Sequence, residues 1–214
     1  MSALRPVPPL SAPPPVPRRP GLAGSFGHAW DGVLTACAQR NMKIHVVAAT
    51  LVGLVGSGIP LHLAEKVSLI FCVLLVFFAE ILNTALEALV DLHTEDFRDL
   101  ARTTKDAAAA AVLVLAIGTV VIFAAIVVTE WPDIARHGPA ILRQAEVGLP
   151  YAACVAALLA DWKRSRWADL LLFAVGNALW VSLWVWTESY VFTALTGSLL
   201  WVAWSARLRH RPAT

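Results

Sequence analysis

The chain alternates long apolar stretches with short polar connections, which is the pattern of a multi-pass helical membrane protein. A helix needs about 20 residues to cross the roughly 30 Å hydrocarbon core of a bilayer. Four long, mostly apolar runs cover residues 67–90, 107–128, 168–186 and 190–204. Two shorter runs, 44–59 and 147–160, are of a length that either spans or lies at the interface. The pattern predicts an all-α integral membrane protein with five or six membrane helices.

Composition agrees with this interpretation. The 214 residues are 58% hydrophobic and only 15% charged, and they include nine tryptophans, which excludes an ordinary soluble domain. Three cysteines, Cys37, Cys72 and Cys154, lie in or beside apolar runs. We expect them to be small packing residues rather than metal or redox ligands.

The basic residues predict the orientation, because Lys and Arg in short loops stay on the cytoplasmic side. If all six runs span and the N-terminus is cytoplasmic, 14 of the 17 Lys and Arg residues lie inside. Only Lys66, Arg136 and Arg143 then lie outside. Removing one span would invert everything after it, so this bias also favours six spans.

The N-terminal 43 residues have two characters. Residues 1–25 are rich in proline and lack the apolar core of a secretory signal, so we expect a disordered cytoplasmic tail. Residues 26–43 place apolar side chains at helical spacing beside polar ones, which predicts one amphipathic helix in the cytoplasmic interface.

A stripe of polar side chains crosses the end of the first long run. On a helix, Asn83, Glu87 and Asp91 fall within about 60° of Glu80, so all four share one face. Ionisable groups in a membrane segment are costly and indicate a functional site. The stripe leads into a charged segment, 91–106, and then into five alanines, 107–111. That segment is either a solvated loop or part of a site for a charged cytosolic substrate, and the alanines suit helix packing or a slot for a lipid tail or nucleotide.

These residue types suit phosphoryl transfer from a nucleotide to a membrane-embedded hydroxyl. Mg²⁺ takes one or two carboxylates together with phosphate oxygens, a Lys neutralises phosphate charge, and a further carboxylate accepts the hydroxyl proton. Glu80 is the deeper residue and suits a base, whereas Glu87 is nearer the water and suits a metal and its nucleotide. The spacing alone is equally compatible with a proton or cation pathway.

Two motifs and their separation closely resemble the prokaryotic diacylglycerol kinase family, which includes the undecaprenol kinases. They are Glu80-Ile-Leu-Asn83-Thr-Ala-Leu-Glu87-Ala-Leu-Val-Asp91 and Lys105-Asp106-Ala-Ala-Ala-Ala-Ala-Val112. Upstream, Phe26-x-x-Ala29-x-x-Gly32 and Arg40-Asn41-Met42-Lys43-Ile44-His45 resemble the undecaprenol kinase branch. The resemblance covers roughly residues 26–128.

The resemblance implies a three-helix transmembrane kinase core with an interfacial helix, assembled as a homotrimer in the bacterial inner (cell) membrane. Such a protein uses ATP and Mg²⁺ to phosphorylate a lipid alcohol, diacylglycerol or undecaprenol, at the cytoplasmic face, and it has no nucleic-acid partner. By resemblance Glu80 is the catalytic base and Glu87 is a magnesium ligand near the nucleotide. Asn83 and Ala109 lie by the lipid substrate. The nucleotide neighbours are Lys105, Asp106, Asp96, Phe97, Arg98 and Gly27.

Two departures from the family bear on activity. Gln39 stands where the family has a glutamate that binds magnesium, and a neutral amide binds this cation more weakly. Asp31, two turns earlier, is a candidate substitute. A catalytically weak member that binds lipid or nucleotide is therefore the alternative function.

The other departure is length. We expect a tail at 1–25, a kinase-like membrane domain at 26–130, and a C-terminal extension at 131–214 with about three further spans. A structural or lipid-facing role is expected for the extension, with a partner-binding or enzymatic module as the alternative.

Overall fold

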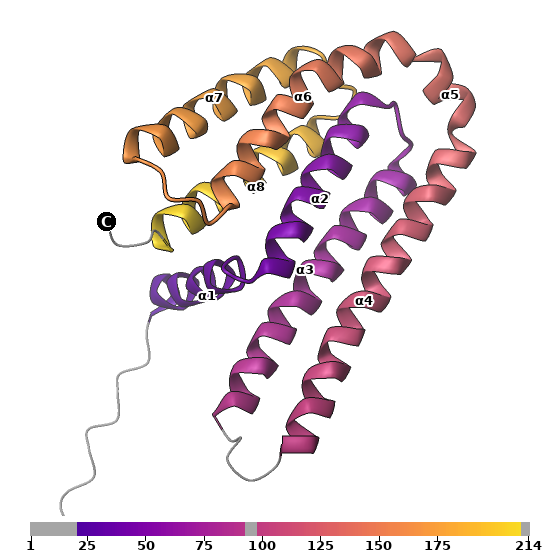
Figure 1. Cartoon of the computed structure of the whole chain (residues 1–214). Helices are drawn as coiled ribbons and strands as arrows, with labels where there is room; N and C mark the ends of the chain where they lie inside the picture. Colours follow the sequence, from indigo (N-terminus) through magenta and orange to yellow (C-terminus); the bar gives the residue numbers. More distant parts are fainter. Residues whose placement is uncertain (1–20, 93–97, 211–214) are drawn as a thin grey trace, which may run out of the picture.

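The computed structural model describes residues 21–92 and 98–210, with the side chain of Arg98 excepted. This part of the chain is helical, as expected from the sequence (Figure 1). The helices are α1 (Leu22–Ala36), α2 (Arg40–Gly58), α3 (Leu63–Asp91), α4 (Arg98–Thr129), α5 (Trp131–Arg136), α6 (Gly138–Leu159), α7 (Arg166–Val185) and α8 (Tyr190–Arg209).

The two longest helices, α3 and α4, form a hairpin that extends beyond the rest of the molecule (Figure 1). With 29 and 32 residues they are about 43 and 48 Å long. Because a bilayer core is about 30 Å thick, part of each helix continues into the aqueous phase. The expected polar stripe begins beside the start of α2 and runs toward the projecting end of α3.

Four helices in the described part are long and apolar enough to cross a membrane, namely α3, α4, α7 and α8. The five or six expected spans include α2 and α6, which are helical but are not among these four. The packing of α2 explains its composition. Its small and polar residues Thr50, Gly53 and Ser57 are buried against other helices, so this face of α2 does not contact lipid and need not be apolar.

The C-terminal helices pack directly on α2, which contacts both α6 and α8. A Cβ atom added at Gly53 would lie 2.7 Å from Thr196 Cγ2, and one added at Gly56 would lie 2.6 Å from the Phe192 ring. Glycine is therefore required for α2 and α8 to approach this closely. The expected extension is thus a continuous part of the packed bundle.

The expected amphipathic helix at 26–43 is divided in two. Helix α1 starts earlier, at Leu22, and ends at Ala36, and α2 starts at Arg40. The break lies at Gln39, whose extended backbone (φ −69°, ψ 139°) is incompatible with a continuous helix. The disordered tail expected at 1–25 lies outside the described residues up to position 20.

Candidate active site

Glu80 is buried in the protein although its side chain is ionisable. Its side chain is 1% exposed, and its Oε2 atom has no hydrogen-bond partner. It is 17 residues after the start of α3 at Leu63, or about 26 Å along the axis. A helix that enters the bilayer near Leu63 therefore brings Glu80 to the far edge of a 30 Å core. A buried, unpartnered carboxylate oxygen at that depth is costly to a protein that makes no use of it.

The rest of the stripe continues toward the water. Asn83 is also buried, and its Nδ2 donates a hydrogen bond of 2.9 Å to Oε1 of Glu87, one turn further along α3. The Oδ1 atom of Asn83 has no partner, like Oε2 of Glu80. The side chains of Glu80, Asn83 and Glu87 therefore share one face of α3, as expected from their spacing. Asp91 is exposed at the end of the helix and pairs with Lys105 of α4 at 2.5 Å.

The start of α2 closes this face into a pocket of ≈ 90 Å³. Its lining residues are Gln39, Arg40, Asn41, Glu80, Asn83 and Glu87. The pocket therefore brings Gln39 beside the α3 stripe, as the family resemblance implied. It also contains Arg40 and Asn41, which belong to the upstream motif and are not among the expected site residues.

The electrostatics of the pocket favour a bound phosphate on one side. The first amide groups of α2 point out of the helix without intrahelical partners, and Gln39 makes no side-chain cap. A helix N-terminus attracts anions, and Arg40 adds a full positive charge there. The opposite wall carries the Glu80 and Glu87 carboxylates. The pocket thus has groups that suit an anion on one wall and groups that suit a cation on the opposite wall.

The donor set fits Mg²⁺ held jointly with nucleotide phosphates. Among the described residues no group of three or more His, Cys, Asp or Glu side chains could hold a metal ion. A magnesium ion bound with phosphates needs only one or two carboxylates, and Glu87 in the pocket lining would be one of them. Asp31 does not line the pocket and instead pairs with Arg209 of α8, so it does not replace the missing glutamate.

The other expected site residues lie outside the pocket lining. Lys105 contacts Asp91, and Asp106 lies 3.7 Å from Arg102 on the exposed side of α4. Ala109 is exposed on α4, and Gly27 is exposed on α1 with open space around it. Asp96 and Phe97 are outside the described residues, and Arg98 is placed only as the first residue of α4. A single chain therefore assembles the α2–α3 side of the site and leaves the α4 groups apart from it.

Known proteins match the same part of the chain. The model of the prokaryotic diacylglycerol kinase family matches residues 27–127. The undecaprenol kinase of Bacillus subtilis is 40% identical over 94 residues, which cover 44% of this chain and 76% of that protein. The chain belongs to the prokaryotic diacylglycerol kinase family. The family match contains α2, α3 and nearly all of α4, and with them every residue of the pocket.

Two diacylglycerol kinases are also similar. That of Synechocystis is 41% identical over 105 residues, or 48% of this chain, and that of Escherichia coli is 32% identical over 96 residues, or 44% of this chain. The aligned region spans only 60% of the length of the Synechocystis protein and 79% of the Escherichia coli protein. No solved structure matches the chain significantly. Helices α5–α8 lie outside the family match.

Proposed function

We propose that this protein is a lipid kinase that transfers the terminal phosphoryl group of ATP, with Mg²⁺, to the hydroxyl group of a membrane lipid alcohol. The observation that carries the proposal is the unpartnered, buried Glu80 oxygen in a polar pocket at the edge of the bilayer. The names of the relatives indicate diacylglycerol or undecaprenol as the alcohol. Both alcohols hold a hydroxyl group at the membrane surface and apolar chains in the core.

The general base of this proposal is Glu80. A hydroxyl anchored by an apolar tail meets the pocket from the membrane side, where Glu80 lies. Its free Oε2 can accept the hydroxyl proton, while the Thr84 hydroxyl bonds the Glu80 backbone oxygen at 3.0 Å and leaves the carboxylate available. A positioned base of this kind contributes about 10²–10⁴-fold to the rate.

In this proposal Glu87 binds the magnesium ion and the α2 N-terminus binds the phosphates. Glu87 would hold Mg²⁺, with Asn83 fixing one carboxylate oxygen through its 2.9 Å hydrogen bond. When bound, the ion neutralises charge on the phosphate oxygens. Arg40 and the free amides of α2 would add hydrogen bonds to the same oxygens. Phosphoryl transfer needs mainly such positioning and charge stabilisation, which this pocket offers.

Lys105 and Asp106 of α4 are proposed to contact the nucleotide. They lie about two turns from the aqueous end of α4, and Lys105 faces α3 through Asp91. Since these groups do not line the pocket of a single chain, a homotrimer, as the family resemblance implies, would supply the missing wall. The basic ends of the helices support a cytoplasmic N-terminus and a cytoplasmic site in a bacterial cell membrane.

The test is label transfer by the purified full chain in mixed micelles. The reaction contains γ-labelled ATP, Mg²⁺ and either diacylglycerol or undecaprenol, with a reaction lacking lipid alcohol as the control. The proposal predicts labelled lipid phosphate with at least one alcohol and none when Mg²⁺ is chelated. Retained nucleotide binding without label in either lipid would refute the kinase proposal.

Gln39 favours a second candidate, a family member of low catalytic activity that binds lipid or nucleotide. Its amide lies in the pocket at the place where a carboxylate would bind the cation more strongly. The substitution Gln39→Glu tests this candidate, and Thr129→Glu, at an exposed position at the far end of α4, is a control that adds the same charge away from the pocket and from the turn between α1 and α2. A weak enzyme should gain turnover and need less Mg²⁺ with Gln39→Glu only. An equal response to both substitutions would show that Gln39 does not limit activity.

A further inference from the structure

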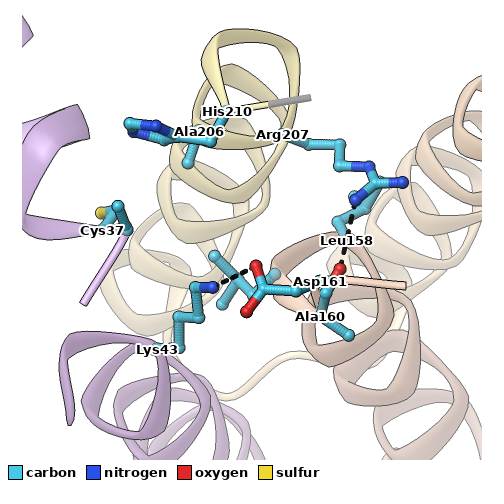
Figure 2. A pocket seen from close by; sticks show the side chains of 10 residues that line it. Cys37, Lys43, Leu158, Ala160, Asp161, Ala206, Arg207 and His210 are labelled. Atoms are coloured by element: carbon cyan, nitrogen blue, oxygen red, sulfur yellow. Dashed lines mark hydrogen bonds and ion pairs between the residues drawn. The ribbon is translucent and has the colours of Figure 1, made fainter. Parts of the chain in front are cut away.

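The turn between α1 and α2 forms part of two pockets. Gln39, Arg40 and Asn41 line the candidate active site. Cys37, Ala38 and Lys43, from the same segment, line a second pocket with the ends of α6 and α8 (Figure 2). We call residues 36–43 the junction. A movement of the C-terminal helices that displaces Cys37, Ala38 or Lys43 would therefore also displace the active-site residues Gln39, Arg40 and Asn41, which are at most three residues away in the chain.

Polar contacts tie the junction and α1 to the C-terminal helices. Lys43, whose side chain is 18% exposed, pairs with Asp161 just after α6 at 2.5 Å (Figure 2). Arg209 at the end of α8 pairs with Asp31 of α1. His210 adds a hydrogen bond of 2.8 Å between its Nε2 and the backbone oxygen of Leu34. These contacts join positions 118 to 178 residues apart in the sequence.

Apolar packing covers the same side of the junction. Leu34, Ala36, Cys37 and Met42 are each at most 6% exposed. They belong to one buried cluster with residues of α6 and α8, which include Leu158, Leu159 and Ala206. The C-terminal helices thus form part of the buried surroundings of the junction, together with α3.

The loop that carries Asp161 is itself fixed. Arg207 of α8 donates to the backbone oxygens of Ala160 and Trp162, on either side of Asp161, at 3.2 and 2.8 Å. Its Nε also donates to Asp169 of α7 at 2.9 Å, and both of these side chains are buried. The backbone on either side of Asp161 is therefore held by Arg207 independently of Lys43. The ion pair between Asp161 and Lys43 can then restrain the junction.

From these contacts we infer that the C-terminal helices α6–α8 are a brace that positions the junction, so that Gln39, Arg40 and Asn41 face Glu80 and Glu87. Lys43, Asp161 and Arg209 are its positioning residues. The inference rests on the proposed function for its kinetic consequence. Positioning matters more here because Gln39 is a weak ligand, and an amide oxygen held in place loses less freedom on binding a cation.

The native Cys37 thiol reports on the junction without any need for activity. The Cys37 side chain is 1% exposed and lies against the ends of α6 and α8, so it should react slowly with a maleimide at pH 7.5. A junction that has separated from α6 and α8 exposes the thiol and speeds the reaction.

The experiment compares two double variants of the full chain. Asp161→Asn/Arg209→Gln removes both ion pairs of the brace and touches no residue of the active site. Asp133→Asn/Arg136→Gln removes the ion pair within α5, far along the chain from the junction, and is the matched control. Three quantities are measured for each: the alkylation rate of Cys37 resolved by mass spectrometry, the Mg²⁺ concentration for half-maximal lipid phosphorylation, and kcat at saturating Mg²⁺. Mn²⁺ binding followed by EPR measures metal affinity without turnover.

The brace predicts that its variant alkylates Cys37 about fivefold faster and needs about fivefold more Mg²⁺, the size expected from losing two partly exposed ion pairs. Its kcat at saturating Mg²⁺ should stay within twofold of wild type, and Asp161→Glu/Arg209→Lys should restore both quantities. The inference would be overturned if the Cys37 alkylation rate and the Mg²⁺ requirement both stay unchanged, or if alkylation becomes faster while the Mg²⁺ requirement does not change. The same shifts in the control variant would also overturn it.

The two proposals fail separately. If wild type phosphorylates no lipid alcohol, the proposed function is wrong. The Mn²⁺ affinities of the variants then test the inference of a brace. An approximately fivefold weaker Mn²⁺ affinity in the brace variant alone supports it, and equal affinities overturn it.

Discussion

The buried ion cluster of Asp169, Arg164 and Arg207 is expected to be the most sensitive part of the C-terminal helices. Asp169 is 1% exposed, and it accepts hydrogen bonds of 3.0 Å from Arg164 and 2.9 Å from Arg207. The substitution Asp169→Asn keeps the volume and removes the charge. Arg207 is then left with a buried guanidinium group and no counter-ion.

The size of the effect follows from burial. Removing one partner of a buried ion pair costs about 3–5 kcal/mol. Arg164 is 16% exposed and retains some water, and Arg207 keeps its two backbone acceptors, so we expect the lower end, about 3 kcal/mol. For a chain of this length that loss lowers the melting temperature by about 6–12 °C. The exposed pair of Asp133 and Arg136 provides the control, since Asp133→Asn should cost less than about 1 kcal/mol.

The assay is thermal unfolding in detergent followed by circular dichroism, with Asp169→Asn, Arg207→Met and the double variant. The double variant should lose less unfolding free energy than the two single variants lose together, because neither Asp169 nor Arg207 then leaves the other charge buried alone. A melting temperature for Asp169→Asn within 2 °C of the Asp133→Asn control would refute this account of the cluster.

Two further substitutions test the site and the helix packing. Glu87→Gln should raise the Mg²⁺ requirement of lipid phosphorylation at least about tenfold, the loss typical of removing even an outer partner of a metal ligand, and an unchanged requirement would remove Glu87 as the ligand. The exposed Glu146→Gln on α6 is its control. Gly56→Ala should destabilise the fold by about 1–3 kcal/mol, because its Cβ would lie 2.6 Å from the buried Phe192 ring. Gly118→Ala, with open space around its Cβ, should be neutral or stabilising in the same unfolding assay, and equal effects of the two would contradict the packing.

The α3 part of the site could be predicted because it depends on one helix. Spacings of three, four and seven residues fix which side chains share a face, and Glu80, Asn83 and Glu87 do line one pocket. The contribution of α2 depends on a tertiary contact. Only the family resemblance placed Gln39 there, and Arg40 was missed because its charge at the start of a helix is also typical of an ordinary interfacial residue.

The role of the C-terminal helices was not predictable for a related reason. The sequence shows apolar runs after residue 138 but not which earlier helix they meet. The pairs Lys43 with Asp161 and Asp31 with Arg209 join residues 118 and 178 positions apart, and neither pair forms a motif. The division of the expected 26–43 helix likewise depends on the packing of Ala36 and Cys37 against these distant helices.

The central claim is that Glu80 is the base of a lipid kinase, and the kcat of Glu80→Gln tests it most directly. The measurement uses purified protein in mixed micelles with saturating ATP, Mg²⁺ and lipid alcohol, and the melting temperature confirms that the variant is folded. The account predicts a fall in kcat of at least about 10²-fold with nucleotide binding retained. A folded Glu80→Gln variant whose kcat lies within twofold of wild type would contradict it.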